Sequence, residues 1–430
     1  MNEQPRRFLR RVWETVRQQP SATAARAADG LISLCDSLLS ERGEVSGARI
    51  ASEAIAAYQA LTEQGRGAFF SKLADQYAAD PTSVERAIEA YRAEPSSARL
   101  NALHTAAEPR RQELFRRLNT APGGTRMLVQ MRADLLRTLD EHPDRTSVDA
   151  DLVHLFRAWF NRGFLVLQRI DWRTSALILE RLIQYEAVHQ IQGWDDLRRR
   201  LEKDRRCYAF FHPALPDEPL IFIEAALTAG IAGNVQTLVD PEAPINDPAE
   251  ARCAIFYSIT NCQLGLRGVS FGNFLIKQVV EDISNEFRRI RKFATLSPVP
   301  GFRAWLSAHR EFMSDELASQ QIEHVSTLID IAPPLKDEIL RLCAYYLLRA
   351  KRKQAPLDSV ARFHLANGAR LARLNWLGDS SAAGIASSLG ITVNYEYRIA
   401  DVEANHEAYA KNFEVVASFT VERLAREVRQ

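Results

Sequence analysis

The hydrophobic pattern of this 430-residue chain changes near residue 169. Before that point, apolar residues recur at the spacing of an α-helix, for example at Ile50, Ala54 and Tyr58. After it, short runs rich in β-branched and aromatic residues indicate strands. A chain of this length is also too long for one ordinary hydrophobic core. The sequence therefore predicts two domains, a helical bundle over residues 1–168 and a second domain over residues 169–430.

The first domain is expected to be an irregular all-α bundle. Apolar residues at helical spacing recur through it, as at Val84, Ile88 and Tyr91, and helix-breaking pairs such as Asp80-Pro81 separate the runs. No repeat of fixed length appears, which argues against a solenoid. The bundle contains no cluster of potential catalytic groups. Packing and self-association are therefore its expected roles.

The second domain is expected to be α+β, with a mixed sheet flanked by helices. Five strands are predicted, at Cys207–Phe211, Leu220–Leu227, Ala254–Ile259, Phe293–Leu296 and Ile391–Ile399. Between the third and the fourth, an apolar stripe that starts at Leu275 predicts a helix.

Charge and composition exclude several classes of protein. The net charge of +1 argues against a general nucleic-acid binder, which needs many phosphate contacts. No apolar run approaches the ~20 residues that span a bilayer, and the basic start has no apolar segment of a secretory signal. Five scattered cysteines without a Cys-x-x-Cys pair fit reduced thiols, and no His/Cys cluster suggests a metal. We therefore expect a cytoplasmic protein that contacts neither membrane nor nucleic acid and holds no metal.

A glycine-rich turn lies between the third predicted strand and the following helix. Gly265, Gly268 and Gly272 permit positive φ and the close approach of a ligand, and Arg267 adds a positive charge. The first turn of the helix offers free N–H groups and the positive end of its dipole. The turn is neither a Walker loop nor a Rossmann fingerprint. Anion binding, most often of a phosphate, is one reading, and an ordinary helix-start loop is the other.

Two side chains farther along the chain are candidates for chemistry. Ser297 directly follows a predicted strand and precedes Pro298 and Pro300, so the turn would fix its side chain at a strand end. The alternative is that Ser297 caps the next helix. His364 lies between Phe363 and Leu365, where it would either point into a cleft or be a hydrogen-bonded core histidine.

The turn resembles the diphosphate loop of the GNAT acyltransferase superfamily. A longer series of segments, in the same order along the chain, resembles the malonyl-CoA decarboxylase family. These segments are Arg205–Tyr208, Glu218–Leu220, Phe256–Thr260, Gly265–Val269, Gly272–Lys277, Leu296–Phe302, Phe363–Ala369, Leu374–Trp376 and Val393–Tyr397. The resemblance is dense in the second half of the chain and weaker in the helical half.

The resemblance implies a GNAT-like acyl-CoA-binding domain behind an N-terminal oligomerisation domain, with Ser297 and His364 as the catalytic pair. It implies malonyl-CoA as substrate, a homotetramer, and no cofactor beyond the coenzyme A of the substrate. The residues it places at the substrate are Arg267, Gly268, Val269, Ser270, Phe271, Gly272, Asn273, Asn367 and Tyr395. Some relatives carry an acidic residue at position 270, so the role of Ser270 stays open. Asn367, Tyr395 and Tyr397 are second-tier candidates, each of which could donate to a carbonyl or be structural, and Asp379 could hold a loop or orient His364.

The chemistry explains why such a pair suffices. Loss of CO2 from malonyl-CoA leaves an electron pair on the thioester, which becomes an enolate and is then protonated on carbon. The site must stabilise that oxyanion, exclude water and return a proton. The direction of proton transfer between Ser297 and His364 stays open, as does activity on methylmalonyl-CoA. Two alternatives also remain, a GNAT-type N-acyltransferase and a non-catalytic coenzyme A-binding assembly protein.

Overall fold

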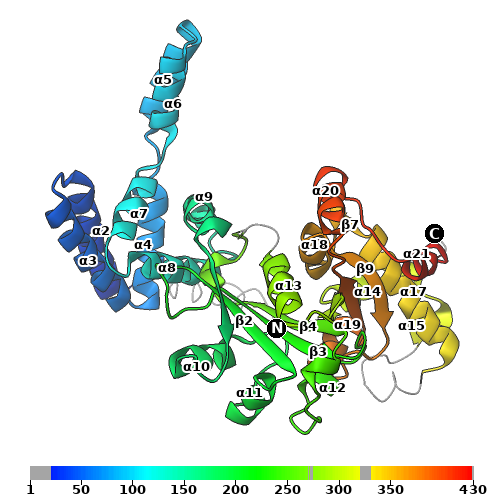
Figure 1. Ribbon diagram of the computed structural model, residues 1–430. Coiled ribbons are helices and arrows are strands. Elements are labelled where there is room, and N and C mark those ends of the chain that lie inside the picture. Colours follow the sequence, from blue (N-terminus) through cyan, green and yellow to red (C-terminus); the bar gives the residue numbers. More distant parts are fainter. Residues whose placement is uncertain (1–20, 270, 272–274, 320–330, 429–430) are drawn as a thin grey trace, which may run out of the picture. The chain divides into compact units, whose positions relative to one another are not determined.

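The computed structural model describes residues 21–269, 271, 275–319 and 331–428 (Figure 1). These residues form two compact units. The helical unit contains the described chain up to Phe164. It also contains two short segments from later in the chain, which begin at His212 and at Gln263. The sheet unit contains the remainder. That residues 1–168 and 169–430 are two separate domains stays a prediction. The sequence does not predict that the two later segments belong to the helical unit, because nothing in their composition distinguishes them from the loops of the sheet unit.

The helical unit is all-α, as predicted. Its helices are α2 (Ala22–Ser40), α3 (Glu44–Ala60), α4 (Glu63–Gln76), α5 (Pro81–Ala93), α6 (Ser97–Ala107), α7 (Arg110–Thr120), α8 (Gly124–Thr138) and α9 (Thr146–Trp159). Their ends follow local rules: Asp80 caps α5 by accepting from the N–H groups of Thr82 and Ser83, with Pro81 in the first turn. None of the described helices combines the length and hydrophobicity needed to cross a bilayer.

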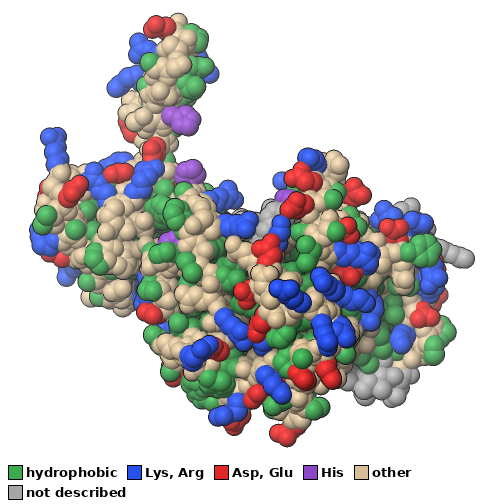
Figure 2. All heavy atoms as spheres, in the orientation of Figure 1, with side chains coloured by type: hydrophobic (Ala, Val, Ile, Leu, Met, Phe, Trp, Pro, Cys, Tyr) green, Lys and Arg blue, Asp and Glu red, His purple; other side chains and the backbone are tan. Residues whose placement is uncertain are grey.

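Helices α5 and α6 form a hairpin that differs from the rest of the unit. No residue of either helix is buried, although Val84, Ile88 and Tyr91 follow a helical pattern. The two short helices pack mainly on each other, and Figure 1 shows the hairpin standing clear of the other helices of the unit. Hydrophobic side chains lie among the charged ones on its surface (Figure 2). Helical periodicity thus identified the helices correctly but not their burial.

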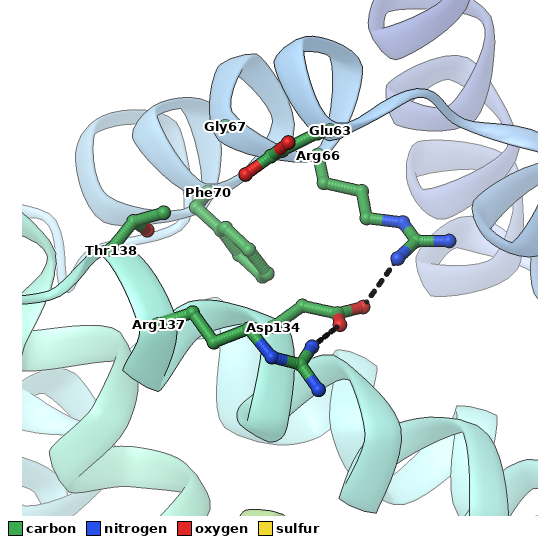
Figure 3. A pocket seen from close by; sticks show the side chains of 7 residues that line it. All are labelled: Glu63, Arg66, Gly67, Phe70, Asp134, Arg137 and Thr138. Atoms are coloured by element: carbon green, nitrogen blue, oxygen red, sulfur yellow. Dashed lines mark hydrogen bonds and ion pairs between the residues drawn. The ribbon is translucent and has the colours of Figure 1, made fainter.

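A pocket of about 290 Å³ lies between α4 and α8 of the helical unit (Figure 3). Its lining consists of Glu63, Arg66, Gly67, Phe70, Asp134, Arg137 and Thr138. The Asp134 carboxylate accepts hydrogen bonds from both arginines and also from Tyr58 and Gln130. The charges of the pocket are therefore largely paired with one another.

The sheet unit confirms the predicted α+β class. One mixed sheet has the order β1-β2-β3-β4-β5-β10-β6, with β9 added to β10. Its strands are β1 (Val166–Ile170), β2 (Arg205–Phe211), β3 (Ile221–Thr228), β4 (Cys253–Asn261), β5 (Lys292–Thr295), β6 (Ser297–Pro298), β9 (Arg370–Asn375) and β10 (Thr392–Glu396). Strands β7 (Lys351–Arg352) and β8 (Ala355–Pro356) form a separate hairpin. Among the strand pairs of this sheet in the described residues, β4 and β5 are parallel and the others are antiparallel.

Helices surround this sheet. They are α10 (Ala176–Tyr185), α11 (Trp194–Arg200), α12 (Gln236–Val239), α13 (Leu275–Glu286), α14 (Phe302–Ala308), α15 (Asp315–Ser319), α17 (Pro333–Arg349), α18 (Ser359–Ala366), α19 (Ala382–Ser388), α20 (Val402–Asn412) and α21 (Phe419–Arg426). Side chains of α10 and α11 pack on Cys207, Ala209 and Phe222 on one face. On the other face, Tyr208 donates to Asp282 of α13 at 2.6 Å. The alternation of strand β2 thus gives each face its own covering helices.

All five predicted strands are present, with shifted ends. The last one, expected over Ile391–Ile399, is only Thr392–Glu396, and its pairing with β9 is irregular between Asn394 and Tyr395. Strands β1, β6 and β9 were not predicted. Three of the five residues of β1 are exposed, and β9 contains Arg370 and Arg373 and buries only Leu371 and Asn375, so both strands lack the continuous apolar signature of an interior strand.

Candidate active site

Ser297 lies where two parallel strands part. Strand β5 pairs with β4 up to Phe256 and Thr295, and Leu296 makes one more hydrogen bond to the Phe256 carbonyl at 2.9 Å. β4 then runs on to Asn261, while the chain after Leu296 pairs instead with β10, Ser297 opposite Val393. The Ser297 side chain is buried. It does not cap the next helix, because α14 has Gly301 at that position, so the capping alternative is wrong.

His364 lies in the last turn of α18. The side chain of Asp358 caps the start of this helix by accepting from the N–H of Ala361 at 2.8 Å. The imidazole Nε2 is 3.0 Å from the Ser297 hydroxyl, and Nδ1 is 2.8 Å from the Tyr397 hydroxyl. Only 3% of His364 is exposed, so the ring is buried rather than directed into an open cleft. Burial lowers the pKa of His364 to about 3 and keeps the ring neutral at physiological pH.

Two tyrosines of the last strand region frame the imidazole. The Tyr395 ring stacks on His364 with centroids 4.6 Å apart and an angle of 21°. The Tyr395 residue is fully buried, and its hydroxyl has no hydrogen-bond partner within the described part of the chain. Tyr397, which is also buried, supplies the contact to Nδ1. Burial raises the pKa of both phenols well above their usual value, so both keep their protons.

The glycine-rich turn follows β4 and packs against α8 of the helical unit. A side chain at Gly265 would come within 1.8 Å of the Val129 carbonyl oxygen, so this glycine is required by helix packing. Gly265 does not adopt the positive φ that the sequence analysis allows for it, and its contact with α8 accounts for the glycine. Arg132 fixes the turn by donating to the carbonyls of Gly265 at 2.7 Å and Arg267 at 2.8 Å.

The other described residues of the turn differ in backbone conformation and exposure. Gly268 has φ +77°, a conformation that favours glycine, and it is exposed, as is Arg267. The side chains of Val269 and Phe271 are buried and therefore contribute to packing. The candidates Ser270, Gly272 and Asn273 lie outside the described residues.

Asn367 and Asp379 have local contacts. The Asn367 amide donates to the Phe363 carbonyl at 2.8 Å, near the end of the helix that carries His364. Asp379 accepts from the side chain of Gln236 and the N–H of Ser381, and so fixes a loop. Orientation of His364, the other role considered for Asp379, belongs to Tyr397 instead.

Sequence reasoning missed two groups at these sites. Thr295 donates and accepts hydrogen bonds beside Ser297, but its strand position looked like ordinary β-propensity. Arg132 sits in a helical segment without any motif, and only the fold brings it to the turn. No local signal identifies either residue, because both act through contacts distant in sequence or through backbone geometry.

The described residues define a class of protein: an α+β protein with a helical unit and a buried, neutral serine–histidine pair at the parting of two strands. No group of three or more His, Cys, Asp or Glu in the described ranges could hold a metal. Such a pair offers hydrogen bonds and a proton in a dry environment, which suits a reaction that develops negative charge on a carbonyl oxygen.

Comparisons with known proteins identify the family. Residues 163–430 match the malonyl-CoA decarboxylase C-terminal domain, and residues 77–160 match the malonyl-CoA decarboxylase N-terminal domain. The chain therefore belongs to the malonyl-CoA decarboxylase family. It is 37% identical over 343 residues to the mitochondrial malonyl-CoA decarboxylase of Anser anser anser, spanning 72% of this chain and 68% of that protein. The corresponding protein of Rattus norvegicus is 35% identical over 349 residues, spanning 74% and 71%.

Solved structures agree with this assignment. The crystal structure of malonyl-CoA decarboxylase from Rhodopseudomonas palustris is similar with a TM-score of 0.88 and 50% identity, covering 92% of this chain and 99% of that chain. The one from Agrobacterium vitis has a TM-score of 0.84 and 47% identity, with the same coverage. The family predicted from the sequence segments is confirmed.

Proposed function

We propose that this chain converts malonyl-CoA to acetyl-CoA and CO2, with Ser297 and His364 as its acid/base pair. The bond between the carboxylate and the α-carbon breaks, CO2 leaves, and the electron pair enters the thioester to form an enolate. The α-carbon then takes up one proton. The observation that carries this proposal is the 3.0 Å contact between a neutral, buried imidazole and a buried hydroxyl.

Each member of the pair has a role that fits its surroundings. The neutral His364 donates a hydrogen bond, because its buried position disfavours the positive charge it would gain as a base; when its N–H proton passes to the α-carbon, a proton from solvent replaces it, so that no imidazolate remains. Ser297 accepts from His364, and in the substrate complex its own O–H turns to donate to the substrate carboxylate. The Tyr395 hydroxyl and the Asn367 amide are proposed to contact the thioester end of the substrate. No cofactor is required by this route, because the thioester itself receives the electrons.

The coenzyme A diphosphate is proposed to bind at the glycine-rich turn. Gly268 with its positive φ and the exposed Arg267 support this, since both favour an anion near the backbone. Arg132 supports it indirectly, because two of its hydrogen bonds fix carbonyls of the turn. Val269, Ser270, Phe271, Gly272 and Asn273 belong to the same proposed segment.

The test is a product analysis on the purified chain in deuterium oxide. Malonyl-CoA should give CO2 and acetyl-CoA whose methyl group carries one deuterium from the solvent. A failure to release CO2 would refute the proposal. Transfer of the acyl group to an added amine, without CO2 release, would instead indicate the N-acyltransferase, and binding without turnover would indicate an assembly protein.

Oligomeric state and location are also proposals. We propose a homotetramer that assembles through the helical unit, supported by the hairpin α5–α6, in which no residue is buried and Leu100 is 45% exposed. Light scattering on the wild type and on Leu100→Glu tests this. We propose a cytoplasmic location, supported by five buried cysteines that form no disulfide.

A further inference from the structure

A third hydroxyl group completes the network around the serine–histidine pair. Thr295 is the last residue of β5 and is fully buried. Its Oγ1 lies 2.8 Å from the Ser297 hydroxyl and 3.5 Å from the Val393 carbonyl, and it accepts from the Tyr395 N–H at 3.1 Å. Ser297 therefore stands between two partners, Thr295 and His364.

The proton positions in this network follow from counting donors and acceptors. The Tyr397 hydroxyl is 2.8 Å from Nδ1 of His364, and no other acceptor for it is present among the described residues. If Nδ1 carried the ring proton, the buried Tyr397 proton would have no acceptor, which is unfavourable. Tyr397 thus donates to Nδ1, and the single proton of the neutral ring is on Nε2.

The remaining protons then have one consistent arrangement. The Nε2–H of His364 donates to Ser297, so Ser297 must direct its own proton elsewhere, and Thr295 Oγ1 is the acceptor in reach. Thr295 in turn directs its proton to the Val393 carbonyl. Each hydroxyl proton and each ring nitrogen has a partner in this chain of hydrogen bonds.

We propose that Thr295 is a positioning residue, which turns the Ser297 hydroxyl away from His364 and thereby keeps the ring proton on Nε2, facing the serine. The inference rests on the proposed function and deepens it, because it sets the direction that the sequence left open: His364 is the donor of the pair and Ser297 the acceptor. Without the Thr295 oxygen, the Ser297 proton is free to point at Nε2, which opposes the preference that Tyr397 imposes and brings the two tautomers closer in energy.

The first test uses the substrate-free, full-length protein labelled with ¹⁵N-histidine, with His364→Asn to assign the ring signals. In the wild type, Nε2 of His364 should show the shift of a protonated nitrogen and Nδ1 that of an unprotonated one. Thr295→Val, which keeps the shape and removes the hydroxyl, should move the two shifts toward each other or exchange them. Thr295→Ser should restore the wild-type pattern. Thr260→Val removes the hydroxyl of a different buried threonine, which lies in strand β4, and should leave the pattern unchanged.

The second test separates positioning from folding. Thr295→Val should lower kcat for malonyl-CoA by at least about tenfold with KM within about threefold, because a wrong tautomer impairs catalysis more than binding. Thr295→Ser should recover most of the loss. A wild-type ring protonated on Nδ1, or a Thr295→Val protein with unchanged tautomer, overturns the inference. Absence of CO2 release by the wild type refutes the proposed function alone, since the tautomer is measured without substrate.

Discussion

Nε2 of His364 lies 3.0 Å from Oγ of Ser297, although 67 positions separate the two residues in the chain. Each side chain is fixed by its own surroundings. Ser297 is placed by the pairing of β6 with β10, and His364 by stacking on Tyr395 and a hydrogen bond to Tyr397. Because both tyrosines come from the β10 region, one strand orients both halves of the pair. The geometry is therefore set before any substrate binds.

The pair should behave as one unit in mutagenesis. Ser297→Ala and His364→Asn are each expected to lower kcat by about 10²–10⁴-fold, the range of general acid–base catalysis. The double variant should lose little more than the worse single variant, because each change disables the same hydrogen-bonded unit. Steady-state kinetics of the four proteins tests this. Losses that multiply in the double variant would show that the two side chains act independently.

The buried hydroxyl of Tyr395 leads to a second prediction. A buried hydroxyl without a partner costs about 1–3 kcal/mol, so Tyr395→Phe should raise the free energy of unfolding of the substrate-free protein by up to that amount. If the hydroxyl contacts the substrate, as proposed, the same change should lower kcat/KM by about tenfold or more. Thermal unfolding and kinetics measure the two effects.

Tyr257 provides the matched control for that prediction. It is also a buried tyrosine of the sheet whose hydroxyl lacks a partner among the described residues. Tyr257→Phe should stabilise the protein to a similar degree and leave kcat/KM unchanged. Equal kinetics for Tyr395→Phe and the wild type would remove Tyr395 from the proposed substrate contacts.

The depressed pKa of His364 predicts how stability depends on pH. The pKa is about 3 in the folded protein and near 6.5 in the unfolded chain. As the pH falls below about 6.5, the unfolded chain binds a proton that the folded protein does not, so stability decreases until the folded pKa is reached. The limiting slope for one group is about 1.4 kcal/mol per pH unit.

Comparison with a variant isolates this contribution. His364→Gln lacks the titrating group. Its stability relative to the wild type, measured by denaturant titration, should therefore increase steadily as the pH is lowered from about 6 to about 4. A difference between wild type and His364→Gln that does not vary with pH would mean that the folded ring takes up its proton as easily as the unfolded one.

Periodicity and strand composition predicted the two halves of the fold, but not every element. The runs around Cys207, Phe222 and Ile255 are buried on both faces and so carry a continuous apolar signal. Strand β9 begins with Arg370 and carries Arg373, side chains that pair with Glu396 and Asn394 across β10. Their pairing partner lies in another strand, so a local pattern does not reveal them.

The candidate site likewise contains residues that the sequence identifies and residues that it does not. Short motifs surround Ser297 and His364 and make them candidates, and the structure brings the two side chains together, whereas Thr295 sits in a strand that predicts nothing beyond burial. The sequence does not indicate why position 265 is a glycine: a side chain there would meet the backbone of α8, more than 130 positions earlier in the chain. A glycine marks a close approach in sequence analysis, but the sequence does not say what approaches.

Arg132 leads to the last prediction, because it connects the helical bundle to the glycine-rich turn. It is buried, pairs with Asp149 at 2.7 Å, and donates to the carbonyls of Gly265 and Arg267. Arg132→Met should release the turn and raise KM for malonyl-CoA by about tenfold while kcat changes little, because binding rather than chemistry is affected. It should also destabilise the protein, since Asp149 loses its partner.

Arg111 separates the two effects of that change. It is a buried arginine of the same unit, with one carboxylate partner, Asp151, and two backbone carbonyls, those of Leu73 and Ala74. Arg111→Met removes an equivalent set of bonds and should cost a comparable amount, about 3–5 kcal/mol, in unfolding experiments. Because none of its partners belongs to the turn, KM should stay at the wild-type value. If both variants raise KM equally, the effect of Arg132 is general destabilisation, and its contacts to the turn contribute nothing to substrate binding.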